Sequence, residues 1–399
     1  MTDNAKKSNN LFDFATSELS QDAFFCWSLN WLAVKEDTED PYYKYGKAML
    51  DLFLGEHKKD IYKEVKVKKQ FNKIDVLVLF KDNQDNQYAL IIEDKTNTSE
   101  HNEQIKKYKE KLNEALSKNQ DIGYENLPGN QIYTAYVKTG IMYSKDIFMK
   151  NTVNTVVDFD RLYSLLKAYS PESKEPIISD IFLDYYHYLE ETQESHKKIE
   201  EMIEKNLYVE ALKTEYGRYC FLKKIFYEEN GKMDLNCKDK TNEADMNVET
   251  IKSGNNNGKV PYAEYTIWNA KHNDKMAKTD QDEYHSIFWR IDSPNSKADE
   301  EIDESYISLR HYDEYTKVNE NTRKRKKDNY TPLREHADKY PNRTCFKQIG
   351  KRSNYIESDL IFIPMSNLQN KDFKEIKKLV RDITEYFISY CKENQSIFR

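Results

Sequence analysis

The stretch Lys73-Ile-Asp-Val-Leu-Val-Leu-Phe80 is followed by the polar segment Lys81–Gln87 and then by Tyr88-Ala-Leu-Ile-Ile-Glu-Asp-Lys95. Two apolar runs rich in β-branched residues, joined by a polar segment without proline, are typical of an antiparallel hairpin. The sequence therefore predicts a β-hairpin over residues 73–95, and the N-terminal half of the chain is organised around it.

Charged residues gather at one end of this hairpin. Folding about the middle of the polar segment places Asp75 opposite Glu93 and Asp94. Side chains two residues apart on a strand point the same way and lie roughly 7 Å apart. Glu93 and Lys95 are therefore expected on one face of the sheet, with Asp94 on the other. Two carboxylates and an ammonium are expected to meet at this rim.

These residue types suit metal-assisted hydrolysis of a phosphodiester. The carboxylates of Asp75 and Glu93, together with the backbone carbonyl of Asp94, are oxygen ligands for a hard cation such as Mg²⁺ or Mn²⁺. A bound cation polarises a phosphate and acidifies a water molecule. The Lys95 ammonium can orient that water or stabilise charge on the phosphate, and burial would lower its pKa toward that of a base.

The elements expected around the hairpin follow the order α-β-β-β-α-β. Apolar periodicity predicts helices over residues 21–33, with Ser20 as the N-cap, and 42–54, and a first strand over 61–69. After the hairpin it predicts a charged helix over 99–117, strands over 131–137 and 153–157, and a helix that begins at Asp158 or Asp160 and ends at 168. This order is typical of an α/β fold with a mixed sheet and helices on both faces.

The rim residues resemble the site of the PD-(D/E)xK nuclease superfamily. Ile74-Asp75 matches the first acid of its motif, and Glu93-Asp94-Lys95 matches the E-x-K triplet. The resemblance implies a restriction-endonuclease-like core, which has the same α-β-β-β-α-β order. Ile74 departs from the proline of the family name at a position that is not a ligand. A branch of uncharacterised nuclease-like proteins is similar also in the Ser20-Gln-Asp22 of the first helix, and the resemblance covers about residues 17–160.

Further residues belong to the same resemblance. A glutamate on the first helix often joins the metal site in this family, which implies that role for Glu18. Some branches carry Gln-x-x-x-Tyr on the helix after the triplet, and Gln104 and Tyr108 match it. These two lie one turn apart on one helix face, where the resemblance implies that they orient the substrate. A helix-start charge and an exposed polar pair are the alternative interpretations.

The second half is expected to form a separate domain. A Pro/Ser/Glu/Lys stretch at 170–176, a helix over 177–191 and a very polar segment at 190–204 place the boundary near residue 195, between domains 1–195 and 196–399. An α+β domain is predicted from a helix over 207–228, strands over 263–270, 285–291, 306–312 and 360–364, and a helix over 372–394. Its basic cluster Arg323–Lys327, with Tyr330 and Arg334 nearby, suits a nucleic-acid backbone, and a solvated loop is the alternative.

Composition narrows the functional class. The 399 residues carry a formal charge of −7, so a nucleic acid would have to meet a local basic face. Five scattered cysteines without a Cys-x-x-Cys pair argue against a disulfide framework and a thiolate zinc site. The sequence has neither a glycine-rich phosphate loop nor a Gly-x-Ser-x-Gly elbow. No apolar run is long enough to cross a membrane, and a cytoplasmic location is predicted.

Two functions remain. The first is a Mg²⁺-dependent nuclease that hydrolyses DNA, which is favoured over RNA as the substrate. By analogy with the superfamily, such a nuclease would act in defence against foreign DNA. The second is a catalytically inactive module that binds nucleic acid or a protein partner. The presence of Asp75, Glu93 and Lys95 together favours the enzyme, because a decayed site is expected to have lost at least one of them. A homodimer would supply the two sites needed to cut both strands, while endo or exo cleavage and sequence preference stay open.

Overall fold

The computed structural model describes residues 9–15, 17–96, 104–117, 127–143, 146, 149–226, 251–256, 260–271, 284–292, 306–313, 330–341 and 357–394. The chain divides into two compact units, Met1–Glu194 and Ser195–Arg399, and the division falls beside the boundary expected near residue 195. Each unit has a sheet of its own. The two units are therefore described separately.

A mixed sheet forms the centre of the N-terminal unit. Its strands are β1 (Lys63–Phe71), β2 (Ile74–Lys81), β3 (Gln87–Lys95), β4 (Ile132–Lys138) and β5 (Thr155–Asp158), in the order β1-β2-β3-β4-β5. The first three strands pair antiparallel, and β3, β4 and β5 pair parallel. Val76 pairs with Ile92, which places Asp75 opposite Glu93. The predicted hairpin and its register are confirmed, as is a mixed α/β architecture.

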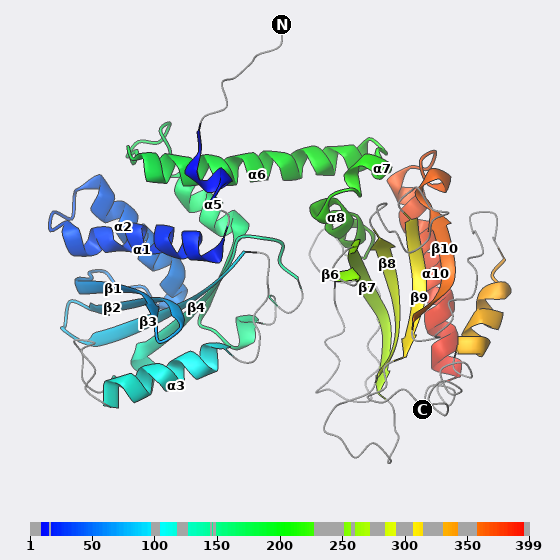
Figure 1. The fold of residues 1–399 in the computed structure, drawn as a ribbon, viewed down its shortest axis with the longest axis horizontal. Coiled ribbons are helices and arrows are strands. Elements are labelled where there is room, and N and C mark those ends of the chain that lie inside the picture. The colour runs from blue at the N-terminus through cyan, green and yellow to red at the C-terminus, as the bar shows by residue number, and fades with distance from the viewer. Residues whose placement is uncertain are drawn as a thin grey trace, which may run out of the picture. The chain divides into compact units, whose positions relative to one another are not determined.

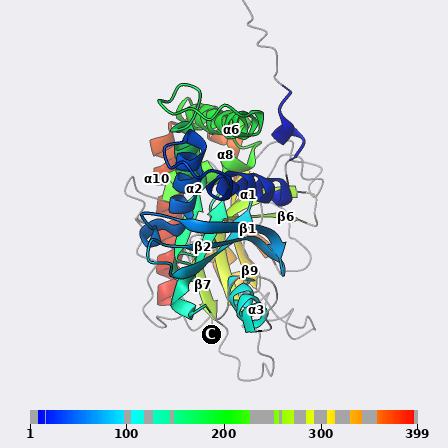
Figure 2. The same cartoon turned by 90° about the vertical axis from the view of Figure 1, so that its left-hand side faces the viewer.

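Side chains of β2 alternate between two layers of core. Val76 and Val78 pack with the helices α1 and α2, whereas Leu77 and Leu79 pack with α3. These helices are α1 (Glu18–Val34), α2 (Pro41–Leu54) and α3 (Gln104–Ser117). Figures 1 and 2 show α1 and α2 over one face of the sheet and α3 over the other. The charged ends of β2 and β3 therefore lie at an edge that helices flank from both sides.

The first helix begins earlier than the sequence predicted. Ser17 stands at the N-cap of α1, and the N–H of Ser20 donates to the Ser17 carbonyl at 2.9 Å. Ser20 is thus inside the helix, and its prediction as the N-cap was wrong. The earlier start makes Glu18 the first helical residue.

The helices after the sheet are α5 (Phe159–Lys167), α6 (Asp180–Glu204), α7 (Tyr208–Ala211) and α8 (Glu215–Phe226). Asp158 caps α5 by accepting from the N–H of Arg161 at 3.0 Å. The helix predicted over 177–191 begins at Asp180 and continues through the polar segment at 190–204, because Ile199 and Ile203 bury one stripe of that segment. The helix predicted over 207–228 is broken into α7 and α8. The two helices approach closely at Gly217 of α8, where a Cβ would lie 1.8 Å from the carbonyl oxygen of Ala211.

An antiparallel sheet forms the C-terminal unit, in the order β10-β9-β8-β7-β6. Its strands are β6 (Ile251–Asn256), β7 (Val260–Lys271), β8 (Tyr284–Asp292), β9 (Tyr306–Asp313) and β10 (Glu357–Pro364), and α10 (Phe373–Glu393) closes the described chain. Strand β6 was missed, because its polar sequence was interpreted as a loop. The indole of Trp289 on β8 donates to Thr384 of α10 at 2.8 Å, so α10 packs on one face of this sheet. Asp372 caps α10 with a capping box.

Some expectations fall outside the described residues. The basic cluster Arg323–Lys327 does so, as does the first part of the helix predicted over 99–117. Tyr330 and Arg334 are described, in a helix over residues 330–338, and both donate to backbone carbonyls of β10. Within the described ranges, no helix is long and apolar enough to cross a membrane.

Candidate active site

Asp75 and Glu93 face each other across the β2–β3 pair, on the side of the sheet that α3 covers. Both oxygens of Asp75 are held by donors from other strands. Oδ2 accepts from the backbone N–H of Asp94 at 3.1 Å, and Oδ1 accepts from the side-chain amide of Gln70 at 3.2 Å. The hairpin register thus fixes the spacing of the two acids, and neighbouring donors orient one of them.

Glu93 is fully buried, and its burial has electrostatic consequences. Burial, followed by the charge of Asp75, raises the pKa of Glu93 to about 8, although the ammonium of Lys95 opposes the rise. Lys95 Nζ lies 2.7 Å from Glu93 Oε1. Among the described residues, neither Glu93 oxygen accepts a hydrogen bond of regular geometry. The carboxylate is therefore held mainly by a cation, which is the environment that a metal ion would also provide.

Lys95 also contacts the first helix. Its Nζ lies 3.7 Å from Oε2 of Glu18, and the other oxygen of Glu18 accepts from the N–H of Thr96 at 3.3 Å. Burial lowers the pKa of Lys95, but the neighbouring carboxylates, Glu93 first, raise it by more. The net direction is upward, so Lys95 is a cation at neutral pH and is unsuited to act as a base. Of the two roles considered for it, orienting water or stabilising charge fits the structure.

The structure brings the Gln-x-x-x-Tyr pair to the same place. Tyr108 packs in the same core cluster as Ile91, which precedes Glu93 by two residues on the same face of β3. Burial and then the charges of Glu93 and Asp75 raise the pKa of Tyr108. Gln104 Nε2 lies 3.4 Å from the Tyr108 hydroxyl, one turn earlier on α3. The two polar side chains therefore line the site and are not an exposed pair on a charged helix.

Asp94 contributes to the site through its backbone. Its side chain lies on the opposite face of the sheet, where Oδ1 accepts from the amide of Gln21 on α1. The N–H and C=O of one residue in a strand point toward the same neighbour. Since the Asp94 N–H points at Asp75 of β2, its carbonyl also points to the β2 side of β3. The carbonyl, and not the carboxylate, is the atom that could join a metal site.

A polar layer beneath Asp94 was not predicted. Gln21 accepts from the hydroxyls of Thr139 and Tyr185, both at 2.8 Å, while it donates to Asp94. Asp22 is buried beside them, and burial followed by the Asp75 charge raises the pKa of Asp22 to about 6. The sequence carried a signal for this layer, because residues 18, 21 and 22 lie on one face of a helix.

Strand β4 places a further ion pair beside the site. Lys138 pairs in register with Lys95, and Tyr136 pairs with Glu93, so all four point to the α3 side of the sheet. The Tyr136 hydroxyl donates to Asp146, whose other oxygen lies 3.9 Å from Lys138 Nζ. Lys138 and Asp146 are both fully buried. This pair supports the floor next to Lys95 and is not accessible to a substrate.

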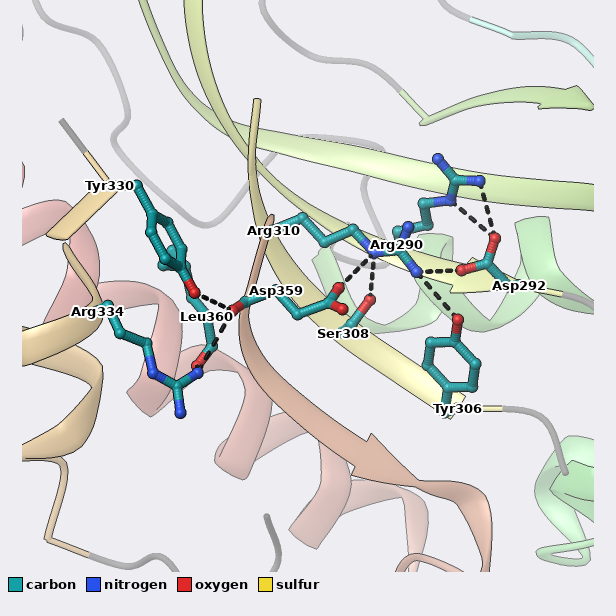
Figure 3. A network of polar contacts seen from close by, with 9 residues as sticks. All are labelled: Arg290, Asp292, Tyr306, Ser308, Arg310, Tyr330, Arg334, Asp359 and Leu360. Atoms are coloured by element: carbon teal, nitrogen blue, oxygen red, sulfur yellow. Dashed lines mark hydrogen bonds and ion pairs between the residues drawn. The ribbon is translucent and has the colours of Figure 1, made fainter. Parts of the chain in front are cut away.

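A second polar cluster lies on the sheet of the C-terminal unit, on the face opposite α10 (Figure 3). Its members on β8, β9 and β10 are Arg290, Asp292, Tyr306, Ser308, Arg310 and Asp359. Arg310 Nε lies 3.0 Å from Asp359, its Nη2 contacts Asp292, and Arg290 Nη2 lies 2.8 Å from Asp292. Burial raises the pKa of Asp292, but the two arginines lower it by more. Since buried charges of both signs are paired here, the cluster links strands and implies no ligand.

The residues at the rim of β3 agree in chemistry with a magnesium site. Within the described residues, no three acidic, histidine or cysteine side chains are grouped closely enough to hold a metal ion by themselves. Mg²⁺ is usually bound by one or two carboxylates together with water and substrate phosphates. Asp75 and Glu93 supply two carboxylates, and the Asp94 carbonyl points from β3 toward β2, the strand that carries Asp75.

Compared with known proteins, the chain matches no family model, no curated protein and no solved structure. The resemblance to PD-(D/E)xK nucleases therefore stays an expectation from the motif residues of the sequence.

Proposed function

We propose that the N-terminal unit is a Mg²⁺-dependent nuclease with a restriction-endonuclease-like core. The observation that carries the proposal is the meeting of six motif residues from four elements, β2, β3, α1 and α3. Asp75 and Glu93 face each other across the β2–β3 pair, and Lys95 contacts both Glu93 and Glu18 of α1. Gln104 and Tyr108 reach the same point from α3. Motif residues this far apart in the sequence are not expected to converge by chance.

Each residue has a role that follows from its environment. Asp75, Glu93 and the Asp94 carbonyl hold Mg²⁺ or Mn²⁺, which supplies polarisation of the phosphate and acidification of water when bound. Lys95, protonated at neutral pH, orients the attacking water or stabilises negative charge on the phosphate. Glu18 holds Lys95 from the side of α1. Tyr108 and Gln104 offer a hydroxyl and an amide to a phosphate or base of the substrate.

The proposal extends to the substrate and the setting. DNA is favoured over RNA as the substrate, and the protein is proposed to act in the cytoplasm. By analogy with the nuclease superfamily, its role would be defence against foreign DNA. A homodimer would give two sites for cutting both strands. The C-terminal unit, with its paired buried charges, is proposed to bind substrate or a partner through surfaces other than that cluster.

The proposal is tested by offering plasmid, linear duplex, single-stranded DNA and RNA to the full chain with Mg²⁺, Mn²⁺ or EDTA. Metal-dependent cleavage is expected, together with a loss of at least ~100-fold in Asp75→Asn. The matched control is Asp85→Asn, which should cut like the wild type because the Asp85 carboxylate pairs with Lys63 at the hairpin turn, at the other end of β2 and β3 from the rim. If no substrate is cut and no metal binds, the nuclease is contradicted and a binding module becomes the better function.

A further inference from the structure

Gln70, near the end of the edge strand β1, reaches two carboxylates that belong to different elements. Its Nε2 lies 3.2 Å from Oδ1 of Asp75 on β2 and 3.0 Å from Oδ2 of Asp22 on α1. A side-chain amide carries two N–H donors, so one glutamine can donate to both acids. An exposed, neutral side chain therefore joins the hairpin to the first helix at the rim of the site.

The backbone of Gln70 has an unusual conformation. Its φ is 53°, in the left-handed region that non-glycine residues rarely adopt. The neighbouring turn residues Asn72 and Lys73 have φ values of 51° and 74°, as a two-residue hairpin turn between Phe71 and Ile74 requires. Gln70 precedes that turn, so the turn does not account for its φ. Rare backbone conformations of this kind concentrate at functional sites.

The effect on Asp75 is to fix its orientation. With Oδ1 held by Gln70 and Oδ2 held by the Asp94 N–H, the carboxylate is held by donors at both oxygens. Donors that orient a metal-holding carboxylate raise the affinity of the site for the metal. The amide also lies between two acids, Asp22 and Asp75, whose charges would otherwise repel each other without an intervening donor.

On the basis of the proposed nuclease function, we infer that Gln70 is a positioning residue for Asp75. It clamps Asp75 to Asp22 of α1, and the metal affinity of the site depends on it although it is not a ligand. The left-handed backbone at Gln70 is what aims its amide at both carboxylates.

The test is calorimetric titration of Mg²⁺ and Mn²⁺ into the full chain for the wild type, Gln70→Gly, Gln70→Ala and Asn72→Gly. Both Gln70 variants are expected to bind metal ~10-fold more weakly or worse. The unfolding temperature of Gln70→Gly in EDTA should not be lower than that of the wild type, because glycine adopts positive φ freely. Asn72→Gly, which relieves the same kind of backbone without touching an acid, should bind metal like the wild type.

Different results would overturn different claims. Metal affinity within about twofold of the wild type in both Gln70 variants would overturn the positioning role and leave the nuclease intact. An equal loss in Asn72→Gly would assign the effect to the hairpin turn and would also overturn it. Absence of metal binding by the wild type itself would contradict the proposed function, and the role of Gln70 with it.

Discussion

The ammonium of Lys95 lies 2.7 Å from Oε1 of Glu93, and both side chains are buried on the same face of β3. The two members of the E-x-K triplet therefore form an ion pair, which lowers the pKa of Glu93 only in part, leaving it at about 8. A metal ion beside Glu93 would favour the ionised form of this buried acid more strongly than the single charge of Lys95 does. The predictions below follow from this pair and from the networks around it.

Replacing Glu93 by glutamine should abolish cleavage and stabilise the fold in EDTA. The folded pKa of Glu93 lies above its ordinary value of 4.5, so ionisation of Glu93 reduces the free energy of unfolding as pH rises from about 4.5 to about 8. The stability gap between Glu93→Gln and the wild type should widen over that range to about 5 kcal/mol and then stay constant. Denaturant titrations at a series of pH values measure it. A gap that does not change with pH would contradict this electrostatic account, and the exposed Glu64→Gln serves as the control.

Asp94→Asn should leave cleavage nearly intact. The Asp94 carboxylate points away from the site, and its carbonyl is unchanged by the substitution. Asp94 and Asp22 are both buried, and burial together with the charge of Asp22 raises the pKa of Asp94. Removing the Asp94 carboxylate should therefore not lower the melting temperature at neutral pH. Cleavage rates and melting curves of the full chain check both expectations. Loss of cleavage in a folded variant would show that the carboxylate itself is needed.

Tyr108→Phe should weaken substrate binding more than catalysis. The substitution removes one hydroxyl that accepts from Gln104 and lies close to Glu93 and Asp75, and it keeps the ring in the core. A hydrogen bond to a phosphate is worth roughly 1–2 kcal/mol, which predicts a rise in KM of about 5–30-fold with a smaller change in kcat. Steady-state kinetics separate the two constants. A fall in kcat alone would instead give Tyr108 a role in the chemical step.

Asp292→Asn should destabilise the C-terminal unit near neutral pH. Asp292 contacts Arg290 and Arg310, and its folded pKa lies below the ordinary value because of them. Its contribution is therefore present above the ordinary pKa of 3.8 and is lost as pH falls through the folded pKa. Breaking a buried pair costs about 3–5 kcal/mol, so calorimetry of the full chain at pH 7 should show one transition lowered by several degrees. The exposed Asp382→Asn should leave both transitions in place; an equal shift there would contradict the assignment.

The local parts of the site could be predicted from the sequence. Two continuous apolar runs joined by a short polar turn predict the β2–β3 hairpin, and its register places Asp75 opposite Glu93. The match of Glu18, Gln104 and Tyr108 to known motifs then named residues that the structure brings to the same rim. The hairpin prediction was confirmed because it rests on a pattern local to two neighbouring strands, whereas the roles of those three residues stay predictions.

The contacts that were missed depend on long-range packing. Gln70 reaches Asp22 only because β1 lies beside α1, and its positive φ leaves no mark in a strand-like sequence. The ion pairs of Arg310 join strands whose pairing depends on long connections. Strand β6 has the composition of a loop and is a strand because it pairs with β7. Tertiary context decided each of these cases.

The measurement that tests the central claim most directly is cleavage of supercoiled plasmid by the wild type, Lys95→Ala and Lys81→Ala, each with Mg²⁺ and with EDTA. Lys81 is the matched control, because it is also a strand-end lysine paired with a glutamate, Glu64, far along β2 from the rim. The account predicts Mg²⁺-dependent cutting by the wild type and Lys81→Ala, and none by a folded Lys95→Ala. Cutting by Lys95→Ala at the wild-type rate would contradict it.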